Sequence, residues 1–295
     1  MLLRKLINSL LSWFAINSTH LIKLSLGYKE GLSNCTCGLE DELAARIKGG
    51  SILRPMGHPS LALITYVDVF SCGGTVVGPN HVLTAAHCLQ GVYELNLLKV
   101  LLGVHDRMNT DDHVKEYDVK EVITHESFQI LKENILFNDI ALLKVDKIEF
   151  NKFIKPICLP FNIDVSHYKA AAVAGWGQTE YRGNPSRMPR VTVLSLLTST
   201  QCDKSGLGPT LSDVTDMHSV ALCAYKLGSD ACQGDSGGPL YVKKDDEITI
   251  QIGIVSFGVK CGSPGKPGLY TRLTHYLHWL DVKLDGGYCR MSDGY

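Results

Sequence analysis

The sequence predicts an all-β protein that ends in one helix. From about residue 60 onward, short runs rich in Val, Ile and Leu recur, and Gly, Pro, Asn and Asp separate them. This pattern is typical of antiparallel strands in a barrel or a sandwich. A helical pattern stands out only at residues 271–287, where leucines share one face and two glycines follow as a stop.

Length, charge and cysteine content narrow the class of protein. A chain of 295 residues can bury a sizeable core, and its net charge of −1 gives no reason to expect nucleic-acid or membrane binding. Ten cysteines predict a disulfide framework and an oxidising compartment outside the cell. Their scattered spacing does not suit a zinc site and no H-E-x-x-H motif occurs, so we expect no metal and no cofactor.

The first 46 residues read as two segments that precede the folded domain. Residues 1–30 begin with basic and then apolar residues, which we interpret as an atypical signal peptide for secretion. Polar interruptions at Asn8, Ser9 and Ser12 leave an amphipathic helix as the alternative. No apolar run reaches the roughly 18 residues of a membrane span. Residues 31–46 are small and polar, as in a linker or pro-piece.

Six apolar runs carry the strand prediction, and turn residues separate them. In chain order they are residues 61–70, 75–86, 97–104, 139–145, 170–177 and 248–258. The helix follows, with Leu273, Leu277, Leu280 and Leu284 on one face and Gly286–Gly287 after it. Such a leucine face predicts a helix that docks on the body of the protein.

Residues 230–239, DACQGDSGGP, set one serine among three glycines. Glycine has no side chain to bury in a core, so three glycines here are hard to explain by packing. They would suit a nucleophilic serine, because neighbouring backbone N–H groups must be free to bind an oxyanion. The candidate base for Ser236 is His87, in the tight apolar stretch LTAAHC. Asp139 precedes an apolar strand, where a carboxylate could orient that imidazole.

Together these stretches resemble the chymotrypsin-like serine proteases. LTAAHC, NDIALL and GDSGGP occur in that family's His–Asp–Ser order, and SCGG, KPICLP, AGWG, VSFG and KPGLYTRL accompany them. The resemblance runs from about Ile47 to Leu284 and implies two six-stranded antiparallel β-barrels with a C-terminal helix. It divides the chain into residues 1–30, a pro-piece at 31–46, a protease domain at 47–284 and a tail at 285–295.

The resemblance implies a role for each candidate. Ser236 would attack the peptide carbonyl, His87 would move the proton and Asp139 would orient His87. The N–H groups of Gly234 and Ser236 would form the oxyanion hole. Asp230 would lie at the base of the pocket and select Arg or Lys, and Ala231 beside it favours Arg. The other residues implied to bind substrate are Ser256, Phe257, Gly258 and Gly268.

Activation by cleavage is also implied. AARIKGG resembles the family's processing site, so a cut after Arg46 would free the Ile47 ammonium to pair with Asp235. The implied core disulfides are Cys72–Cys88, Cys202–Cys223 and Cys232–Cys261. Cys158 would hold the pro-piece through Cys35 or Cys37, and the remaining cysteine could join Cys289. The tail that carries Cys289 resembles arthropod venom and haemolymph proteases.

The loop at residues 103–118 departs from calcium-binding members, because Val104 stands where they carry an acid. We therefore interpret Asp111, Asp112 and Glu116 as a solvated loop. The expected protein is a secreted, monomeric zymogen that cuts after Arg or Lys. Its expected partners are protein substrates, an activating protease and serpin- or Kunitz-type inhibitors. The alternative is a catalytically silent homologue that acts as a binding or cofactor module.

Overall fold

The computed structural model describes residues 28–40, 51–109, 111–131, 135–179, 182–205, 217–228, 231–245, 247–258 and 263–291. The chain divides into two units, Met1–Glu30 and Gly31–Tyr295, and all elements below belong to the second. Several expected features lie outside the described residues: most of the signal segment, the Arg46–Ile47 cleavage site, Asp230 and Cys261. No helix in the described ranges is long and apolar enough to cross a membrane.

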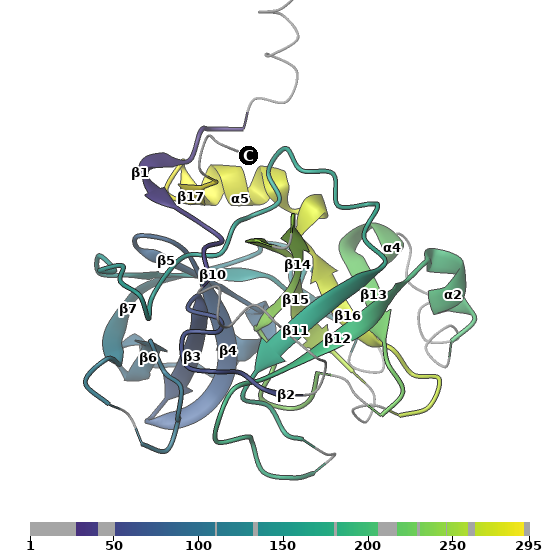
Figure 1. Ribbon diagram of the computed structural model, residues 1–295, viewed down its shortest axis with the longest axis horizontal. Coiled ribbons are helices and arrows are strands. Elements are labelled where there is room, and N and C mark those ends of the chain that lie inside the picture. The colour runs from purple at the N-terminus through teal and green to yellow at the C-terminus, as the bar shows by residue number, and fades with distance from the viewer. Residues whose placement is uncertain are drawn as a thin grey trace, which may run out of the picture. The chain divides into compact units, whose positions relative to one another are not determined.

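Six antiparallel strands close the first barrel, on the left of Figure 1, in the order β10-β5-β4-β3-β6-β7. They are β3 (Leu61–Tyr66), β4 (Val69–Gly78), β5 (His81–Thr84), β6 (Leu98–Leu102), β7 (Lys115–Thr124) and β10 (Ala141–Val145). Pairing of β10 with β7 closes the ring. Because β10 also pairs with β5, the residues that follow β5 meet those that precede β10.

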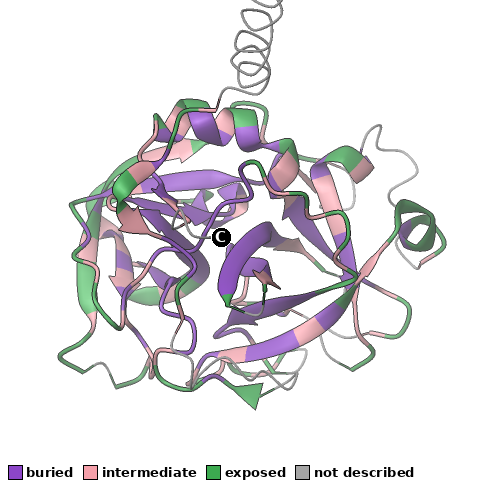
Figure 2. Ribbon diagram, turned by 45° about the horizontal axis from the view of Figure 1, so that its top comes forward, coloured by how far each residue is buried: buried purple, intermediate pink, exposed green. Residues whose placement is uncertain are grey.

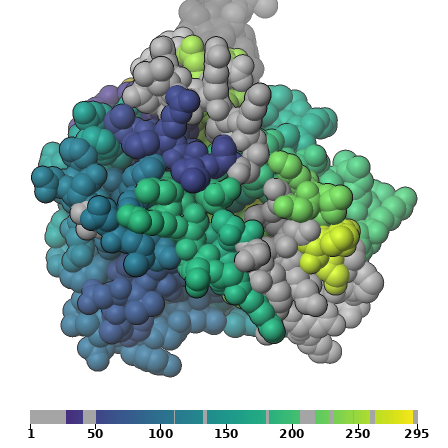
Figure 3. All heavy atoms as spheres, turned by 60° about the horizontal axis from the view of Figure 1, so that its bottom comes forward, coloured from purple at the N-terminus to yellow at the C-terminus, as the bar shows by residue number. Residues whose placement is uncertain are grey.

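The second barrel has the order β11-β14-β15-β16-β13-β12, and pairing of β11 with β12 closes it. Its strands are β11 (Ala170–Gly175), β12 (Arg190–Leu197), β13 (Ala221–Tyr225), β14 (Pro239–Lys244), β15 (Ile248–Phe257) and β16 (Gly268–Arg272). The short strand β2 (Ser51–Ile52) adds to β12. The prediction of two six-stranded antiparallel barrels is therefore confirmed. In Figure 3 the earlier, blue part of the chain gathers on the left and the later, green-to-yellow part on the right.

Short elements connect the barrels or cover their ends. The strands are β1 (Leu32–Thr36), β8 (Gln129–Ile130), β9 (Leu136–Phe137) and β17 (Cys289–Arg290). The helices and 3-10 turns are η2 (Ala86–Leu89), η3 (Leu95–Leu97), α2 (Ser199–Asp203), α4 (Met217–Val220), η5 (Leu273–His275) and α5 (Leu277–Leu284).

The four leucines of the predicted helix are all buried, which confirms that it docks on the body. Its first turn is the separate 3-10 turn η5, and the α-helix begins at Leu277. It ends where Asp285 and Gly286 take the left-handed backbone, with φ of 49° and 78°. Figure 2 shows buried positions alternating with exposed and intermediate ones along the C-terminal helix.

One prediction for the first barrel is wrong. Glu116 does not lie in a solvated loop but in β7, opposite Leu101 of β6. Of the residues in β7, Val119 alone is fully buried. The outer face is polar, with Lys99 Nζ 3.5 Å from Glu116 Oε1. A strand so exposed lacks the apolar alternation that would reveal it in the sequence.

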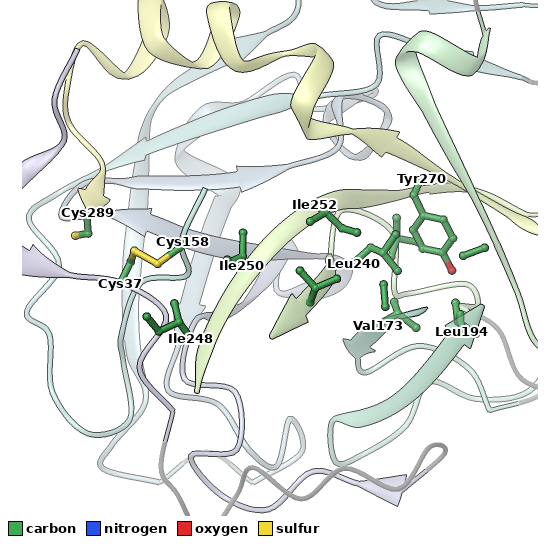
Figure 4. Close-up of a cluster of buried hydrophobic side chains, with 14 residues drawn as sticks. Cys37, Cys158, Val173, Leu194, Leu240, Ile248, Ile250, Ile252, Tyr270 and Cys289 are labelled. Atoms are coloured by element: carbon green, nitrogen blue, oxygen red, sulfur yellow. A yellow bond between two sulfur atoms is a disulfide. The ribbon is translucent and has the colours of Figure 1, made fainter. Parts of the chain in front are cut away.

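Aliphatic side chains from several strands fill the second barrel (Figure 4). Leu194, Leu240, Ile250, Ile252 and Tyr270 are each at most 2% exposed. Burying one such side chain stabilises the fold by about 1.5–3 kcal/mol. This core supplies a rigid support for the loops at the barrel ends.

Residues 31–40, here called the tethered segment, are fastened to the barrels. Cys37 pairs with Cys158 and Cys35 with Cys289, which resolves the alternatives that the sequence leaves open. Gly38 accepts a hydrogen bond from Thr249 N–H at 3.0 Å, and its own N–H donates to Pro156 O at 2.8 Å. The structure also contains Cys72–Cys88 and Cys202–Cys223. Cys232 is disulfide-bonded, but its expected partner Cys261 is outside the described residues.

A buried ion pair also anchors the tethered segment. Glu40 Oε2 lies 2.6 Å from Lys243 Nζ on β14, with side-chain exposures of 4% and 15%. Thr249 Oγ1 donates a hydrogen bond of 2.8 Å to Glu40 Oε1. This carboxylate therefore satisfies both an ammonium and a hydroxyl that are largely shielded from water.

Replacing Glu40 by Ala should leave the Lys243 ammonium without its partner. We expect the free energy of unfolding to fall by about 3 kcal/mol, measured by chemical denaturation. Glu149→Ala is the control, because the Lys147–Glu149 pair is about 80% exposed and 3.9 Å long. It should change stability by less than about 0.5 kcal/mol. Equal effects of the two variants would contradict an anchoring role for Glu40.

His58 should make stability depend on pH. Burial lowers its pKa below the ordinary value of 6.5, and the nearby Glu40 charge offsets this only in part. The unfolded chain then binds the proton more readily, so this stability is complete above about pH 6.5 and lost as the pH falls. His58 Nδ1 lies 3.0 Å from Ser60 Oγ.

The matching variant is His58→Phe combined with Ser60→Ala, which removes the titrating ring and its buried hydroxyl partner. Between about pH 7 and pH 5 its unfolding free energy should decline less steeply, by up to about 1.4 kcal/mol per pH unit. Denaturant midpoints at several pH values measure this slope. Identical slopes in both proteins would show that His58 does not contribute.

Candidate active site

The pairing of β5 with β10 brings His87 and Asp139 together. Ala141 on β10 lies opposite Thr84 on β5. Asp139 stands two residues before Ala141, and His87 three residues after Thr84, in the 3-10 turn η2. Antiparallel register thus places the carboxylate and the imidazole at the same end of the barrel.

Asp139 holds His87 by two hydrogen bonds. Its Oδ2 lies 2.7 Å from His87 Nδ1, and its Oδ1 accepts the His87 backbone N–H at 2.8 Å. The Asp139 side chain is fully buried, whereas the His87 side chain is 21% exposed. This bidentate contact fixes the ring orientation and assigns the Nδ1 proton, leaving Nε2 to face a reactant.

Two hydroxyl groups of the second barrel hold Asp139 in turn. Ser256 Oγ on β15 donates to Asp139 Oδ2 at 2.6 Å. Thr271 Oγ1 on β16 donates to the Asp139 backbone carbonyl at 2.7 Å. The carboxylate of one barrel is therefore held by side chains of the other, and no local sequence pattern indicates either contact.

Asn138, just before Asp139, adopts a left-handed φ of 56°. Its Nδ2 donates to Ser127 O at 2.8 Å, and its Oδ1 accepts from Tyr276 Oη at 2.8 Å. Burial, followed by the charge of Asp139, raises the pKa of Tyr276. The Tyr276 hydroxyl therefore keeps the proton that it donates.

Ser236 lies in the turn before β14, and that turn packs against the end of the first barrel. The Ser236 carbonyl accepts a 2.8 Å hydrogen bond from Gly73 N–H. A Cβ on Gly237 would stand 2.2 Å from Thr84 Oγ1, so only glycine fits there. This close approach brings the Ser236 turn to the residues that lead into His87.

The Cys72–Cys88 bridge joins the neighbours of this contact, since Cys72 precedes Gly73 and Cys88 follows His87. His87 Nε2 has Cys88 Sγ at 3.9 Å, and among the described residues no hydrogen bond joins it to Ser236 Oγ. Contacts between a nucleophile and its base are often long until a reactant binds.

Two backbone N–H groups beside Ser236 are available to an anion. Within the described ranges, neither Gly234 N–H nor Ser236 N–H donates a hydrogen bond. By contrast, Asp235 N–H donates to Cys232 O at 2.9 Å, and Gly237 N–H donates to Val255 O at 2.9 Å. Gly234 has a φ of 95°, which favours glycine. The turn therefore leaves two neighbouring N–H donors without an acceptor among the described residues, and donors of this kind can bind an oxyanion.

The Asp235 carboxylate lies against two glycines. Its Oδ1 accepts from Gly177 N–H at 2.7 Å, and its Oδ2 accepts from Cys232 N–H at 2.9 Å. A Cβ on Gly175 or Gly177 would come within 2.3 Å of this carboxylate. The two glycines of AGWG thus make room for the acid that follows Gly234.

The predicted pocket residues are described only in part. Asp230 lies outside the described residues, while Ala231 is half-buried, Gly258 exposed and Gly268 buried. Phe257 on β15 pairs with Leu269 on β16, so the implied walls come from adjacent strands. The Ser256 hydroxyl donates to Asp139, and its predicted contact with substrate stays a prediction.

Cys72, His87 and Cys88 bring sulfur and nitrogen atoms within 4.8 Å of one another. The two sulfurs form the Cys72–Cys88 disulfide, so they cannot act as thiolate ligands. This grouping therefore does not have the donor chemistry of a metal site.

Comparisons with known proteins show the family of the chain. The chain matches the family described as Trypsin over residues 47–280. It is 34% identical over 266 residues to the clotting factor G beta subunit of Tachypleus tridentatus, covering 85% of this chain and 84% of that one. It is 32% identical over 267 residues to a venom serine protease of Polistes dominula, covering 87% and 91%. The proclotting enzyme of Tachypleus tridentatus is 34% identical over 262 residues, covering 83% and 68%.

Proposed function

The chain belongs to the trypsin family of serine proteases, and from that premise we propose that it is a secreted endopeptidase made as a zymogen. It hydrolyses peptide bonds after Arg or Lys through Ser236, His87 and Asp139. The observation that carries the proposal is the buried Asp139 carboxylate, which holds His87 by its Nδ1 and its backbone N–H.

Catalysis proceeds through an acyl-enzyme. Ser236 Oγ attacks the carbonyl carbon as His87 Nε2 takes its proton, and Asp139 stabilises the imidazolium that results. The oxyanion is bound by Gly234 N–H and Ser236 N–H, which have no other acceptor among the described residues. His87 then gives its proton to the leaving amine, and water attacks the ester by the same steps in reverse.

Specificity rests on Asp230, whose carboxylate would pair with the Arg or Lys side chain of the substrate. Gly258 and Gly268 leave the entrance open for a long side chain, and Phe257 borders the substrate backbone. Ala231 stands where a serine is often found and favours Arg over Lys. A guanidinium is long enough and has enough donors to bind the Asp230 carboxylate directly, without help from a neighbouring hydroxyl.

Activation follows cleavage between Arg46 and Ile47 by an upstream protease. The new Ile47 ammonium pairs with Asp235, which stands between Gly234 and Ser236 in the chain, and this pairing orders the oxyanion hole. One of the similar proteins is named a proclotting enzyme, in keeping with a proenzyme. The tethered segment stays attached after the cut through its two disulfides. The active chain works as a monomer, with serpin- or Kunitz-type proteins as its inhibitors.

Hydrolysis of matched peptides ending in Arg, Lys or Phe tests this function. The chain is assayed before and after quantitative cleavage at Arg46, with Ser236→Ala as the control. We expect turnover of the Arg and Lys peptides only, and only after cleavage. Asp230→Ser should remove the preference for basic residues. No turnover by correctly cut, fully disulfide-bonded protein would instead support a silent homologue that acts as a binding module.

A further inference from the structure

We propose that Asn34 carries an N-linked glycan. Asn34-Cys35-Thr36 is an N-x-Thr acceptor sequence for N-linked glycans. The ten cysteines of the chain predict that it passes through an oxidising secretory compartment, where such glycans are added. This inference concerns a face of the molecule that takes no part in catalysis. The test measures the mass of the secreted protein and not its activity, so its result is independent of the proposed function.

The position of Asn34 suits a glycan. It lies in β1 and is exposed, as is its neighbour Ser33. Among the described strands β1 pairs with β17 alone, through Leu32 opposite Cys289 and Thr36 opposite Arg290. The pairing is irregular between Leu32 and Thr36, and within this stretch Cys35 is half-buried in its disulfide whereas Asn34 is exposed.

The neighbouring disulfide is the obvious obstacle, and the order of synthesis removes it. Cys35 pairs with Cys289, which is 254 residues later in the chain. Synthesis runs from the N-terminus, so Cys289 does not yet exist when the Asn34 sequence first enters the secretory compartment. Cys35 is then not held by this bridge, and the acceptor segment can adopt the extended form that sugar transfer requires.

The folded protein also leaves space for the sugars. Asn34 borders a groove of about 590 Å³ between the tethered segment and the first barrel. Asn80, Asp146, Lys147 and Glu149 give this groove polar groups, and Phe150 gives it an apolar surface. Hydroxyl groups of a sugar can bond to the former and its ring face can pack on the latter.

The groove lies at the opposite ends of the strands that carry the catalytic residues. Asn80 precedes β5 and Asp146 follows β10, whereas His87 follows β5 and Asp139 precedes β10. Strands of four and five residues separate the two places by roughly 15 Å. In Figure 1, β1 and β17 lie together beside α5. A glycan on Asn34 therefore leaves the active site open.

The test uses the full chain, secreted from human cells behind an efficient secretion signal. Asn17→Gln removes the other acceptor sequence, so Asn34 is the remaining one. Peptide N-glycosidase F should lower the mass of the secreted protein by one glycan and leave Asp at position 34. Asn34→Gln and Thr36→Ala should both abolish the mass change, whereas Thr36→Ser should keep it. Hydrolytic activity after cleavage should be the same with and without the glycan.

Cys289→Ala distinguishes the role of the disulfide. Because the bridge forms after sugar transfer, this variant should carry the same glycan as the unaltered chain. Unmodified Asn34 in the unaltered chain would overturn the proposal. If the glycan appeared only in Cys289→Ala, the bridge itself would be what prevents modification.

Discussion

Replacing Ser236 by Ala is expected to lower the turnover number of the cleaved chain about a millionfold. The hydroxyl is the group that forms the proposed acyl-enzyme, and the Gly234 and Ser236 N–H groups beside it are the proposed oxyanion donors. Binding of the peptide should change little, because alanine keeps the turn and its Gly73 hydrogen bond, which uses the Ser236 carbonyl. Steady-state hydrolysis of an Arg peptide measures both the turnover number and KM.

Ser33→Ala is the matched control, since it removes an exposed hydroxyl from β1, away from the catalytic residues. It should retain full activity. If Ser236→Ala kept more than about a hundredth of the original turnover, the acyl-enzyme mechanism would be excluded, because the loss expected for a nucleophile is far larger.

Replacing Asp139 by Asn is expected to lower the turnover number about ten-thousandfold. An amide is nearly the same size, so the Thr271 contact to the backbone carbonyl can remain. However, if the amide NH₂ faces His87 Nδ1, it donates a hydrogen bond and moves the ring proton to Nε2. The imidazole then cannot accept the Ser236 proton.

The readout that separates this effect from a structural one is the split between kcat and KM. Loss of the correct tautomer should lower kcat and leave KM nearly unchanged. Asp146→Asn serves as the control, because Asp146 is exposed and its one ion pair among the described residues is with Lys120 at 3.1 Å. An Asp139→Asn protein with near-normal kcat would contradict the assigned role of Asp139.

Much of the fold was predictable because most strands carry continuous apolar runs. The runs at residues 61–70 and 139–145 became β3 and β10, and the leucine face became η5 and α5. β7 was missed because its outward residues are charged and only Val119 is fully buried. β1 was missed for another reason: its small, polar residues form a strand through pairing with β17 and two disulfides, which no local pattern reveals.

In the candidate site, too, some residues could be predicted from the sequence and others could not. His87, Asp139 and Ser236 stand in short, distinctive stretches, so sequence reasoning could name them. Their supports could not be found, because Ser256 and Thr271 are 117 and 132 residues away from Asp139 in the chain. The Glu40–Lys243 pair spans 203 residues, and ordinary charged residues of this kind give no sign of burial.

Covalent labelling of the cleaved chain by a fluorophosphonate, which reacts with activated serines, tests whether Ser236 is an activated nucleophile. Intact mass and peptide mapping give the number and position of adducts. We expect one adduct per chain, on Ser236, in the chain cut at Arg46, and little or none in the uncut chain or in His87→Ala. A correctly cut and disulfide-bonded chain with no adduct on Ser236 would contradict this expectation.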